Sequence, residues 1–298
     1  MPGASEENSR GTWWNATRRL VQRGAGHGRP PAPPRIGLAL GGGFARGIAH
    51  LGVLRVLKEH GIPIHAVAGV SAGSIVAAAY AGGCASDHVE SIACAMRFRD
   101  VARWTISRLG FVESDRMAAF LKRLLKEDRF EKMQIPLAIV ATDLCSGAPV
   151  VFRDKGDVVW PIRASCSYPG LFMPIKYAGH WLVDGAVSME VPAKPLRDMG
   201  ATRVISVNIP SPETGADPSS MFSVVNRCFQ VMSGRLEPEW RKYSDLVITP
   251  AAGQLAWDSF DAAMKIIELG EKAARSALPV IQQWLQTCEP KQPLPLAV

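Results

Sequence analysis

The chain has 298 residues, of which 47% are hydrophobic and 20% charged, and its formal net charge is +7 at pH 7. This composition is typical of a globular chain with a large core, and it argues against a fibrous or disordered protein. No apolar run reaches the roughly 18 residues of a membrane span, and residues 1–35 lack the apolar core of a signal peptide. We therefore expect a cytoplasmic protein. Its 6 cysteines show no Cys-x-x-Cys spacing, which favours reduced, buried thiols.

The N-terminal residues form a basic leader rich in arginine, with Trp13 and Trp14 among them. A proline-rich spacer ends it, so we expect an unstructured leader over 1–34, a folded domain over 35–288 and a Pro-rich tail over 289–298. The leader either contacts an anionic surface as a peripheral membrane segment or has no partner. The chain shows no zinc module or RNA-binding signature, which disfavours nucleic acid.

The first predicted elements are a strand, a glycine-rich loop and a helix. Residues 35–40 are a short apolar run typical of a buried strand, and the loop 41–47 (GGGFARG) follows it directly. The helix begins at Ile48, carries apolar residues at helical spacing and is expected to end at Gly61. A second strand over 64–70 then leads into an alanine-rich helix over 71–82.

The remaining chain continues this alternation of strands and helices. It predicts a three-layer α/β/α fold with a mostly parallel central sheet in one domain. Residues 87–130 show a helical pattern that is broken at 109–111. Further strands are expected at 137–142, 149–152, 175–177, 181–183, 203–209 and 246–249, and further helices at 160–167, 192–199, 221–236 and from about residue 259, the last bent or ended by Pro279.

A glycine-rich loop at the start of a helix is an anion-binding feature. A dinucleotide site would also require an acidic residue at the end of the second strand, which here ends in Val70-Ser71, and the Lys-Ser/Thr pair of a P-loop is absent. We therefore expect no nucleotide cofactor. Parallel strands bring both loops to one edge of the sheet, so the N–H groups of Gly42 and Gly43 are expected to face an oxyanion formed at Ser71. Arg46 either adds positive charge or, as we favour, fixes the loop.

Ser71 lies in Gly69-Val-Ser-Ala-Gly73, between a predicted strand and a predicted helix. This is the context in which Gly-x-Ser-x-Gly forms a nucleophile elbow, with glycines beside the serine because a Cβ there would clash. The alternative interpretation is a glycine-rich turn in which Ser71 only caps the following helix.

A nucleophilic serine needs a base, and the positions of the histidines do not match that of a triad histidine. None follows a late strand, where the histidine of an α/β-hydrolase triad belongs, and His180 at a predicted hairpin tip is the sole contender. Asp184 is a better candidate, because it ends an apolar strand and precedes Gly185 in a turn that can aim a carboxylate.

Five motifs occur in order within residues 35–186, about half of the chain. They are 40–54 (LGGGFARGIAHLGVL), 69–73 (GVSAG), 141–144 (ATDL), 163–174 (RASCSYPGLFMP) and 184–186 (DGA). Together they resemble the patatin-like phospholipase family, in particular its bacterial members related to the esterase domain of neuropathy target esterase.

This resemblance implies a patatin-like fold and a Ser–Asp dyad in place of a triad, with Ser71 as nucleophile and Asp184 as base. It implies hydrolysis of an acyl ester in a phospholipid, lysophospholipid or acylglycerol through an acyl-enzyme, with no cofactor and no metal. The oxyanion hole falls on Gly42, Gly43 and Phe44, supported by Gly41, Arg46, Gly47, Gly69, Gly73 and Gly185.

Phe44 departs from the family pattern, since many relatives carry a fourth glycine there. Either the position needs a positive φ that strains Phe44, or the ring lines the acyl channel. Alternative functions also stay open. Phe44 and the basic leader favour a non-catalytic membrane-associated or regulatory module on the same scaffold, and the dyad alone does not exclude an acyltransferase or thioesterase. A triad through His180 is a third option.

Overall fold

A central sheet of eight strands organises the computed structural model. The structure describes residues 32–105, 107–210, 217 and 219–286, without the side chain of residue 222. Residues Pro34–Trp284 form one compact unit. The predicted leader and tail lie almost entirely outside the described residues, so both stay predictions.

The strand order is β10-β9-β1-β2-β5-β8-β7, and β6 also pairs with β5. The five strands from β10 to β5 run parallel, whereas β6, β7 and β8 join antiparallel at one edge. This confirms the expected mostly parallel sheet. The strands are β1 (Ile36–Leu40), β2 (Ile64–Val70), β5 (Leu137–Asp143), β6 (Pro149–Arg153), β7 (Ile175–Tyr177), β8 (His180–Asp184), β9 (Arg203–Val207) and β10 (Leu246–Ile248).

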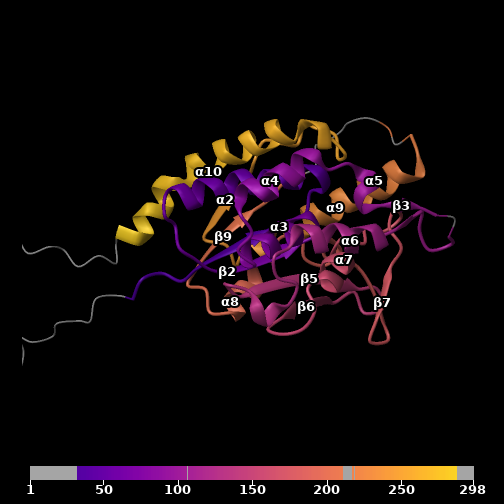
Figure 1. The fold of residues 1–298 in the computed structure, drawn as a ribbon, viewed down its shortest axis with the longest axis horizontal. Helices are drawn as coiled ribbons and strands as arrows, with labels where there is room; N and C mark the ends of the chain where they lie inside the picture. Colours follow the sequence, from indigo (N-terminus) through magenta and orange to yellow (C-terminus); the bar gives the residue numbers. More distant parts are fainter. Residues whose placement is uncertain (1–31, 106, 211–216, 218, 287–298) are drawn as a thin grey trace, which may run out of the picture. The chain divides into compact units, whose positions relative to one another are not determined.

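Helices cover both faces of the sheet, which gives the expected three layers (Figure 1). Helices α3 and α7 pack on one face, where α2, α4 and α10 are drawn outside them, and α8 packs on the other. The helices are η1 (Phe44–Ile48), α2 (Ala49–Glu59), α3 (Ala72–Ala81), α4 (Ser86–Ala95), α5 (Phe98–Val101), α6 (Asp115–Leu124), η2 (Phe130–Lys132), α7 (Val159–Ser165), η3 (Gly185–Val187), α8 (Ala193–Asp198), α9 (Met221–Arg241), η4 (Phe260–Ala262) and α10 (Ala263–Gln286). No described helix combines the length and apolar character needed to cross a membrane.

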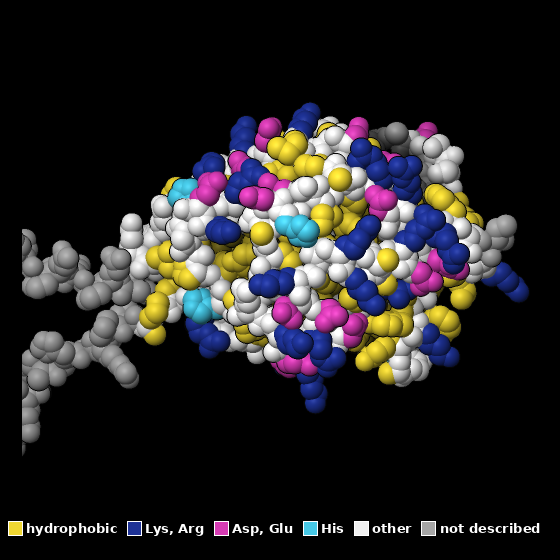
Figure 2. All heavy atoms as spheres, in the orientation of Figure 1, with side chains coloured by type: hydrophobic (Ala, Val, Ile, Leu, Met, Phe, Trp, Pro, Cys, Tyr) yellow, Lys and Arg dark blue, Asp and Glu magenta, His cyan; other side chains and the backbone are white. Residues whose placement is uncertain are grey.

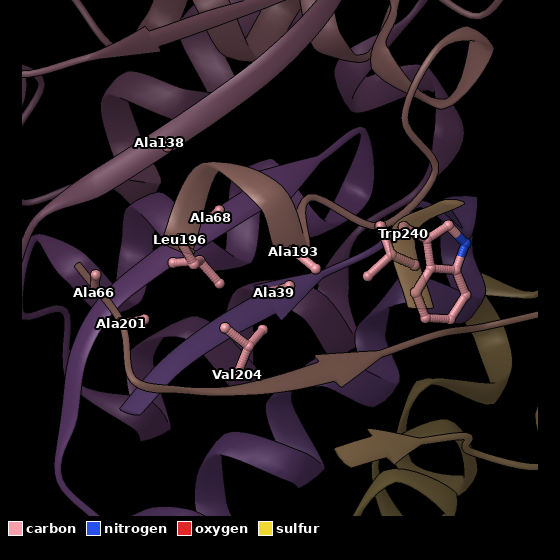
Figure 3. Close-up of a cluster of buried hydrophobic side chains, with 10 residues drawn as sticks. Ala39, Ala66, Ala68, Ala138, Ala193, Leu196, Ala201, Val204 and Trp240 are labelled. Atoms are coloured by element: carbon pink, nitrogen blue, oxygen red, sulfur yellow. The ribbon is translucent and has the colours of Figure 1, made fainter. Parts of the chain in front are cut away.

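Small side chains let α8 approach the sheet closely. Figure 3 shows Leu196 and Ala193 of α8 over Ala39 of β1 and Ala68 of β2, in a cluster that Trp240 of α9 closes. Interiors are close-packed, so a larger side chain at either strand position would displace the helix. The α8 layer therefore holds the carboxyl ends of β1 and β2 in fixed positions.

Three local expectations are corrected in part. Within 87–130 the helical pattern is interrupted more widely than at 109–111, because these residues belong to the turn between two short antiparallel strands, β3 (Arg103–Trp104) and β4 (Val112–Glu113). Pairing across a turn does not show in local periodicity. Helix α10 does not end at Pro279 but continues to Gln286, with Leu278 and Ile281 buried on either side of the proline, so of the two expected effects only a bend stays a prediction. Of the described cysteines, Cys166 alone is buried, while Cys145 and Cys228 are exposed.

Candidate active site

Strand register brings Ser71 and Asp184 to the same level of the sheet. Val70 of β2 pairs with Val140 of β5, and the next residue, Ala141, pairs with Asp184 of β8. Because β6 pairs along the other side of β5, β2 and β8 follow each other on one side of it, and Ser71 and Asp184 are neighbours there. Only glycine fits at position 185, because a Cβ there would lie 2.2 Å from the carbonyl oxygen of Val140. Gly185 therefore allows the backbone after Asp184 to pass close to β5.

Ser71 occupies a sharp turn between β2 and α3, as the elbow motif predicts. Its φ of 51° and ψ of −127° are a strained combination for a residue with a side chain. The flanking glycines are required by space: a Cβ on Gly69 would lie 2.5 Å from the carbonyl oxygen of Gly73, and one on Gly73 would lie 2.3 Å from that of Leu40. The elbow is therefore locked against β1 and α3.

Two further serines hold this turn by hydrogen bonds. The backbone N–H of Ser71 donates to Ser165 Oγ at 2.8 Å, and Ser165 Oγ in turn donates to the carbonyl of Val140 at 2.6 Å. Ser74 Oγ donates to the carbonyl of Ser71 at 2.6 Å. The first interaction spans 94 residues, so no local sequence signal assigns Ser165 this role, although Ser165 lies within one of the five motifs.

Asp184 is buried at the end of β8, and its carboxylate is only half satisfied. Oδ1 accepts a hydrogen bond from the N–H of Ala186 at 2.9 Å, whereas Oδ2 accepts none from the described residues. Burial raises the pKa of this carboxyl to about 7, and the Ala186 N–H and the nearby Ser71 hydroxyl oppose the rise. A hydroxyl beside an unsatisfied carboxylate oxygen is a geometry that can tighten into a hydrogen bond when substrate binds.

The glycine-rich loop faces the same point. A Cβ on Gly42 would lie 3.6 Å from the Cβ of Ser71, so Gly42 leaves open the space beside the serine. Gly43 has a φ of 153° and precedes η1, and the N–H groups at the N-terminus of a helix have no intrahelical partner. The loop is anchored at both ends by Gly41 N–H to Val207 O and Ala45 N–H to Trp257 O, each 3.0 Å.

Phe44 has a φ of 51°, which is the left-handed conformation that glycine adopts easily. Its ring is packed edge-on against Tyr168, with centroids 4.9 Å apart, and against Trp257, with centroids 5.1 Å apart. The ring also lies between the cavity above Ser71 and an apolar cavity of about 60 Å³ under α3 and α4. The backbone of Phe44 thus has the strained positive φ, and this residue lines the cavity at Ser71, while its role in an acyl channel stays a prediction.

Arg46, Gly47 and His50 support the loop. Arg46 is buried and its Nη1 donates to the carbonyl of Pro210 at 3.4 Å, while burial lowers its pKa. A Cβ on Gly47 would lie 2.5 Å from that of Ala72, so the two loops touch here. His50 Nε2 lies 2.9 Å from the carbonyl oxygen of Gly41, and burial lowers the His50 pKa to about 4. A neutral His50 donating to that carbonyl positions the loop, a role that the sequence did not reveal.

The loop, the elbow and Asp184 open into a cavity of about 640 Å³. Helix α9 forms its opposite wall with Asn226, Phe229, Gln230, Ser233 and Glu237. Tyr168 joins the two walls, because its ring stacks on Phe229 with centroids 4.3 Å apart and its hydroxyl donates to Asn226 Oδ1 at 3.2 Å. This wall was not foreseen, since α9 is more than thirty residues from any of the five motifs.

His180 lies outside this arrangement. It stands at the opposite end of β8 from Asp184, about 13 Å away along an extended strand. Its side chain is 63% exposed, and its Nδ1 lies 3.1 Å from Asp143 Oδ2. Asp143 also binds Cys145 N and Ser146 Oγ in the β5–β6 turn, as expected of a turn residue. Among the described residues, no group of His, Cys, Asp and Glu side chains is arranged to hold a metal ion.

The family model for the patatin-like phospholipases matches residues 38–197, which include the loop, the elbow and Asp184. The chain belongs to the patatin-like phospholipase family. An uncharacterized NTE family protein of Mycobacterium tuberculosis is 32% identical to this family member over 206 residues, 67% of this chain and 57% of the relative. The human patatin-like phospholipase domain-containing protein 6 is 31% identical over 192 residues, 59% of this chain and 13% of the relative. The chain therefore spans little more than half of even the shorter relatives.

Two solved structures are similar to this patatin-like chain at low identity. Human GIVD cytosolic phospholipase A2, in complex with methyl gamma-linolenyl fluorophosphonate, has a TM-score of 0.49 and 12% identity over 92% of this chain and 62% of that one. VipD from Legionella pneumophila has a TM-score of 0.46 and 14% identity over 87% of this chain and 67% of that one.

Proposed function

We propose that this chain is a serine lipid acyl hydrolase that uses Ser71 and Asp184 as a catalytic dyad. The observation that carries the proposal is the buried Asp184 carboxylate, which has one unsatisfied oxygen and a pKa of about 7 next to a serine held in a strained elbow. A base whose pKa lies near the working pH is both ionised and able to accept a proton.

The reaction proceeds in two acyl transfers. Ser71 Oγ attacks the ester carbonyl carbon while its proton passes to Asp184 Oδ2, and the carbonyl oxygen becomes an oxyanion bound by the N–H groups of Gly42, Gly43 and Phe44. The C–O bond to the alcohol then breaks, and Asp184 returns the proton to the leaving alkoxide. Water attacks the acyl-enzyme with the same proton route, which releases the fatty acid and restores the Ser71 hydroxyl. Each oxyanion donor contributes roughly 3 kcal/mol to the transition state.

The surroundings of the dyad support a lipid substrate. One wall of the 640 Å³ cavity carries aromatic rings, and Phe44 separates it from a second, apolar cavity beneath. Such a site suits an acyl chain beside a polar glycerol or phosphate ester. One curated relative, of Mycosarcoma maydis, is named a lysophospholipase, which supports a phospholipid or lysophospholipid over a small soluble ester.

Hydrolysis of p-nitrophenyl butyrate by single variants tests the dyad. Ser71→Ala and Asp184→Asn should each lower kcat by roughly 10³-fold or more, because both groups act in one step. His180→Ala is the control and should retain the wild-type rate. A fluorophosphonate probe should label the wild type at Ser71 and not the Ser71→Ala variant.

Three results would contradict this assignment. Wild-type turnover in either dyad variant would exclude the dyad, and loss of turnover in His180→Ala would restore the triad. Absence of both turnover and labelling in the wild type would favour a non-catalytic module. Release of acyl product onto an added alcohol or thiol, in preference to water, would instead indicate an acyltransferase.

The basic leader contributes a second part of this proposal, peripheral contact with anionic lipid. The full chain should float with vesicles of phosphatidylcholine and phosphatidylglycerol, and Arg18→Glu with Arg19→Glu should weaken flotation at low salt, since exposed charges act within a Debye length. A paired Lys265→Glu and Lys272→Glu variant at exposed positions of α10 controls for net charge. Equal flotation of the leader variant and the wild type would contradict a contact between these leader arginines and anionic lipid.

A further inference from the structure

A patch of large apolar side chains is exposed beside the catalytic cavity. Trp104 is 68% exposed, Leu109 57% and Phe111 45%, all on the β3–β4 hairpin, and Met221 at the start of α9 is 68% exposed. These four side chains line one groove of about 550 Å³. Soluble proteins rarely expose large apolar side chains in such a contiguous group unless the surface binds something.

Hydrogen bonds hold the two strands of the hairpin together and attach the hairpin to the rest of the fold. Trp104 pairs with Val112 across the ladder, and Thr105 N–H donates to Phe111 O at 2.8 Å. Phe111 N–H in turn donates to Leu171 O at 3.0 Å, which ties the hairpin to the segment preceding β7. Trp104 and Phe111 are therefore exposed from hydrogen-bonded strand ends of the hairpin.

Helix α9 continues the patch. Met221 and Val224 lie three residues apart and are both exposed, so they share one side of the first turn of α9. The inner side of the same helix lines the catalytic cavity with Asn226 and Phe229. The first turn of α9 thus exposes apolar side chains at the groove, while later turns of the helix border the catalytic cavity.

Aromatic contacts connect the patch to the dyad. Trp257 lines the groove and lies against Phe98, with ring centroids 5.9 Å apart, and against Phe44, with centroids 5.1 Å apart. Phe44 in turn lines the catalytic cavity beside Ser71. An acyl chain leaving an apolar phase at the patch would thus meet aromatic side chains up to the dyad.

The charge around the patch favours a lipid surface over a second copy of this chain. Among the described residues, exposed Arg97, Arg99, Arg108 and Arg116 form no ion pair with an acidic side chain. The acidic groups of the same segment are engaged: Asp100 accepts from Arg97 N, Glu113 pairs with Arg103 and Asp115 pairs with Arg163. Asp258 is the acidic residue of the groove lining. Figure 2 shows Lys and Arg side chains gathered over α5, α6 and β3.

We propose that the hairpin residues Trp104, Leu109 and Phe111, with Met221 and Val224 of α9, form a docking surface that inserts into the interface of an anionic lipid bilayer and presents the catalytic cavity to it. Trp is suited to this position, because its ring is apolar and its N–H is polar, and arginine extends its charged group to the phosphates. The purpose of this docking surface rests on the proposed function, because it would bring the lipid substrate to the dyad. Binding of the surface to lipid does not depend on catalysis by Ser71 and Asp184.

Vesicle sedimentation with the full chain tests the surface. Trp104→Ser with Leu109→Ser should lower partitioning onto phosphatidylcholine–phosphatidylglycerol vesicles by roughly tenfold or more, as expected for two large apolar side chains. Hydrolysis of vesicle phospholipid should fall in parallel, while turnover of dissolved p-nitrophenyl butyrate stays within about twofold, since neither residue touches Ser71. The matched control, Leu144→Ser with Val280→Ser, removes two exposed aliphatic side chains elsewhere and should change neither.

The outcomes separate docking from catalysis. Ser71→Ala should bind vesicles like the wild type, so an inactive wild type that still docks through the patch would overturn the proposed function alone. Unchanged partitioning of the patch variant would overturn the docking surface. So would an equal loss of soluble-ester turnover, or a patch variant that changes from dimer to monomer by analytical ultracentrifugation while it still binds vesicles.

Discussion

Asp184→Asn should stabilise this protein at high pH while it abolishes hydrolysis. The carboxyl pKa lies at about 7 in the folded chain against a reference value of 3.8, because burial disfavours the charged form. A rise of about three pK units corresponds to a cost of about 4 kcal/mol for the ionised, folded state. That cost is absent below pH 4, grows between pH 4 and about 7, and is complete above this range. Asparagine is neutral throughout and keeps an oxygen for Ala186 N–H.

The expected gain is smaller than the full cost, because the new amide N–H₂ needs a partner in the place of Oδ2. Allowing about 1–3 kcal/mol for that desolvation leaves a net gain of about 1–3 kcal/mol at pH 8. In a chain of this size each kcal/mol raises Tm by about 2–4 °C. The gain should disappear near pH 4, where the wild-type carboxyl is protonated.

Thermal unfolding of wild type and variant at pH 8 and pH 4.5, followed by tryptophan fluorescence, measures the difference. Asp143→Asn is the matched control with the opposite sign. Hydrogen bonds from Cys145 N and Ser146 Oγ, and contact with His180, lower the Asp143 pKa, so Asp143→Asn should lose stability at pH 8 and lose less at low pH. The explanation that burial raises the pKa of Asp184 would be refuted by either of two results. The Tm difference between Asp184→Asn and wild type would not change with pH, or it would be negative at pH 8.

Three further predictions follow from the same geometry. The kcat/KM for p-nitrophenyl butyrate should rise with pH to half its maximum near pH 7 and be roughly 100-fold lower at pH 5, because only ionised Asp184 accepts a proton; a flat profile from pH 5 to 8 would exclude it as base. Phe44→Gly should be about 1 kcal/mol more stable in urea than Phe44→Ala, since both remove the ring but only alanine keeps the cost of a φ of 51°; the reverse order would show that this φ is not strained. Gly42→Ala should fold, because its Cβ meets nothing closer than 3.6 Å, yet lower kcat by about 10²-fold by intruding beside Ser71. Gly73→Ala, whose Cβ would lie 2.3 Å from Leu40 O, should instead yield little folded protein by circular dichroism, and equal folding of the two variants would contradict the close packing of the elbow.

The sequence by itself determined the elbow, the glycine-rich loop and the turn after β8. Gly69, Ser71 and Gly73 form a contiguous motif whose steric demands are local, and the apolar runs before Ser71 and Asp184 predict buried strands by periodicity. Alternation of strands and helices then fixed a mostly parallel sheet, and parallel strands deliver consecutive loops to one edge. The fold class and the family resemblance were confirmed, whereas the roles of Ser71 and Asp184 stay proposals.

Only the tertiary structure decided how these groups behave. Asp184 owes its high pKa to burial and to an oxygen left without a partner, which depend on every element packed around β8. Ser165 holds the elbow from 94 residues away. Helix α9 supplies the second wall of the cavity, and the β3–β4 hairpin arises where a helical pattern was expected. Local periodicity and motifs predict the conformation of a segment. They do not predict which distant segment packs against it, because the packing of the whole chain decides that.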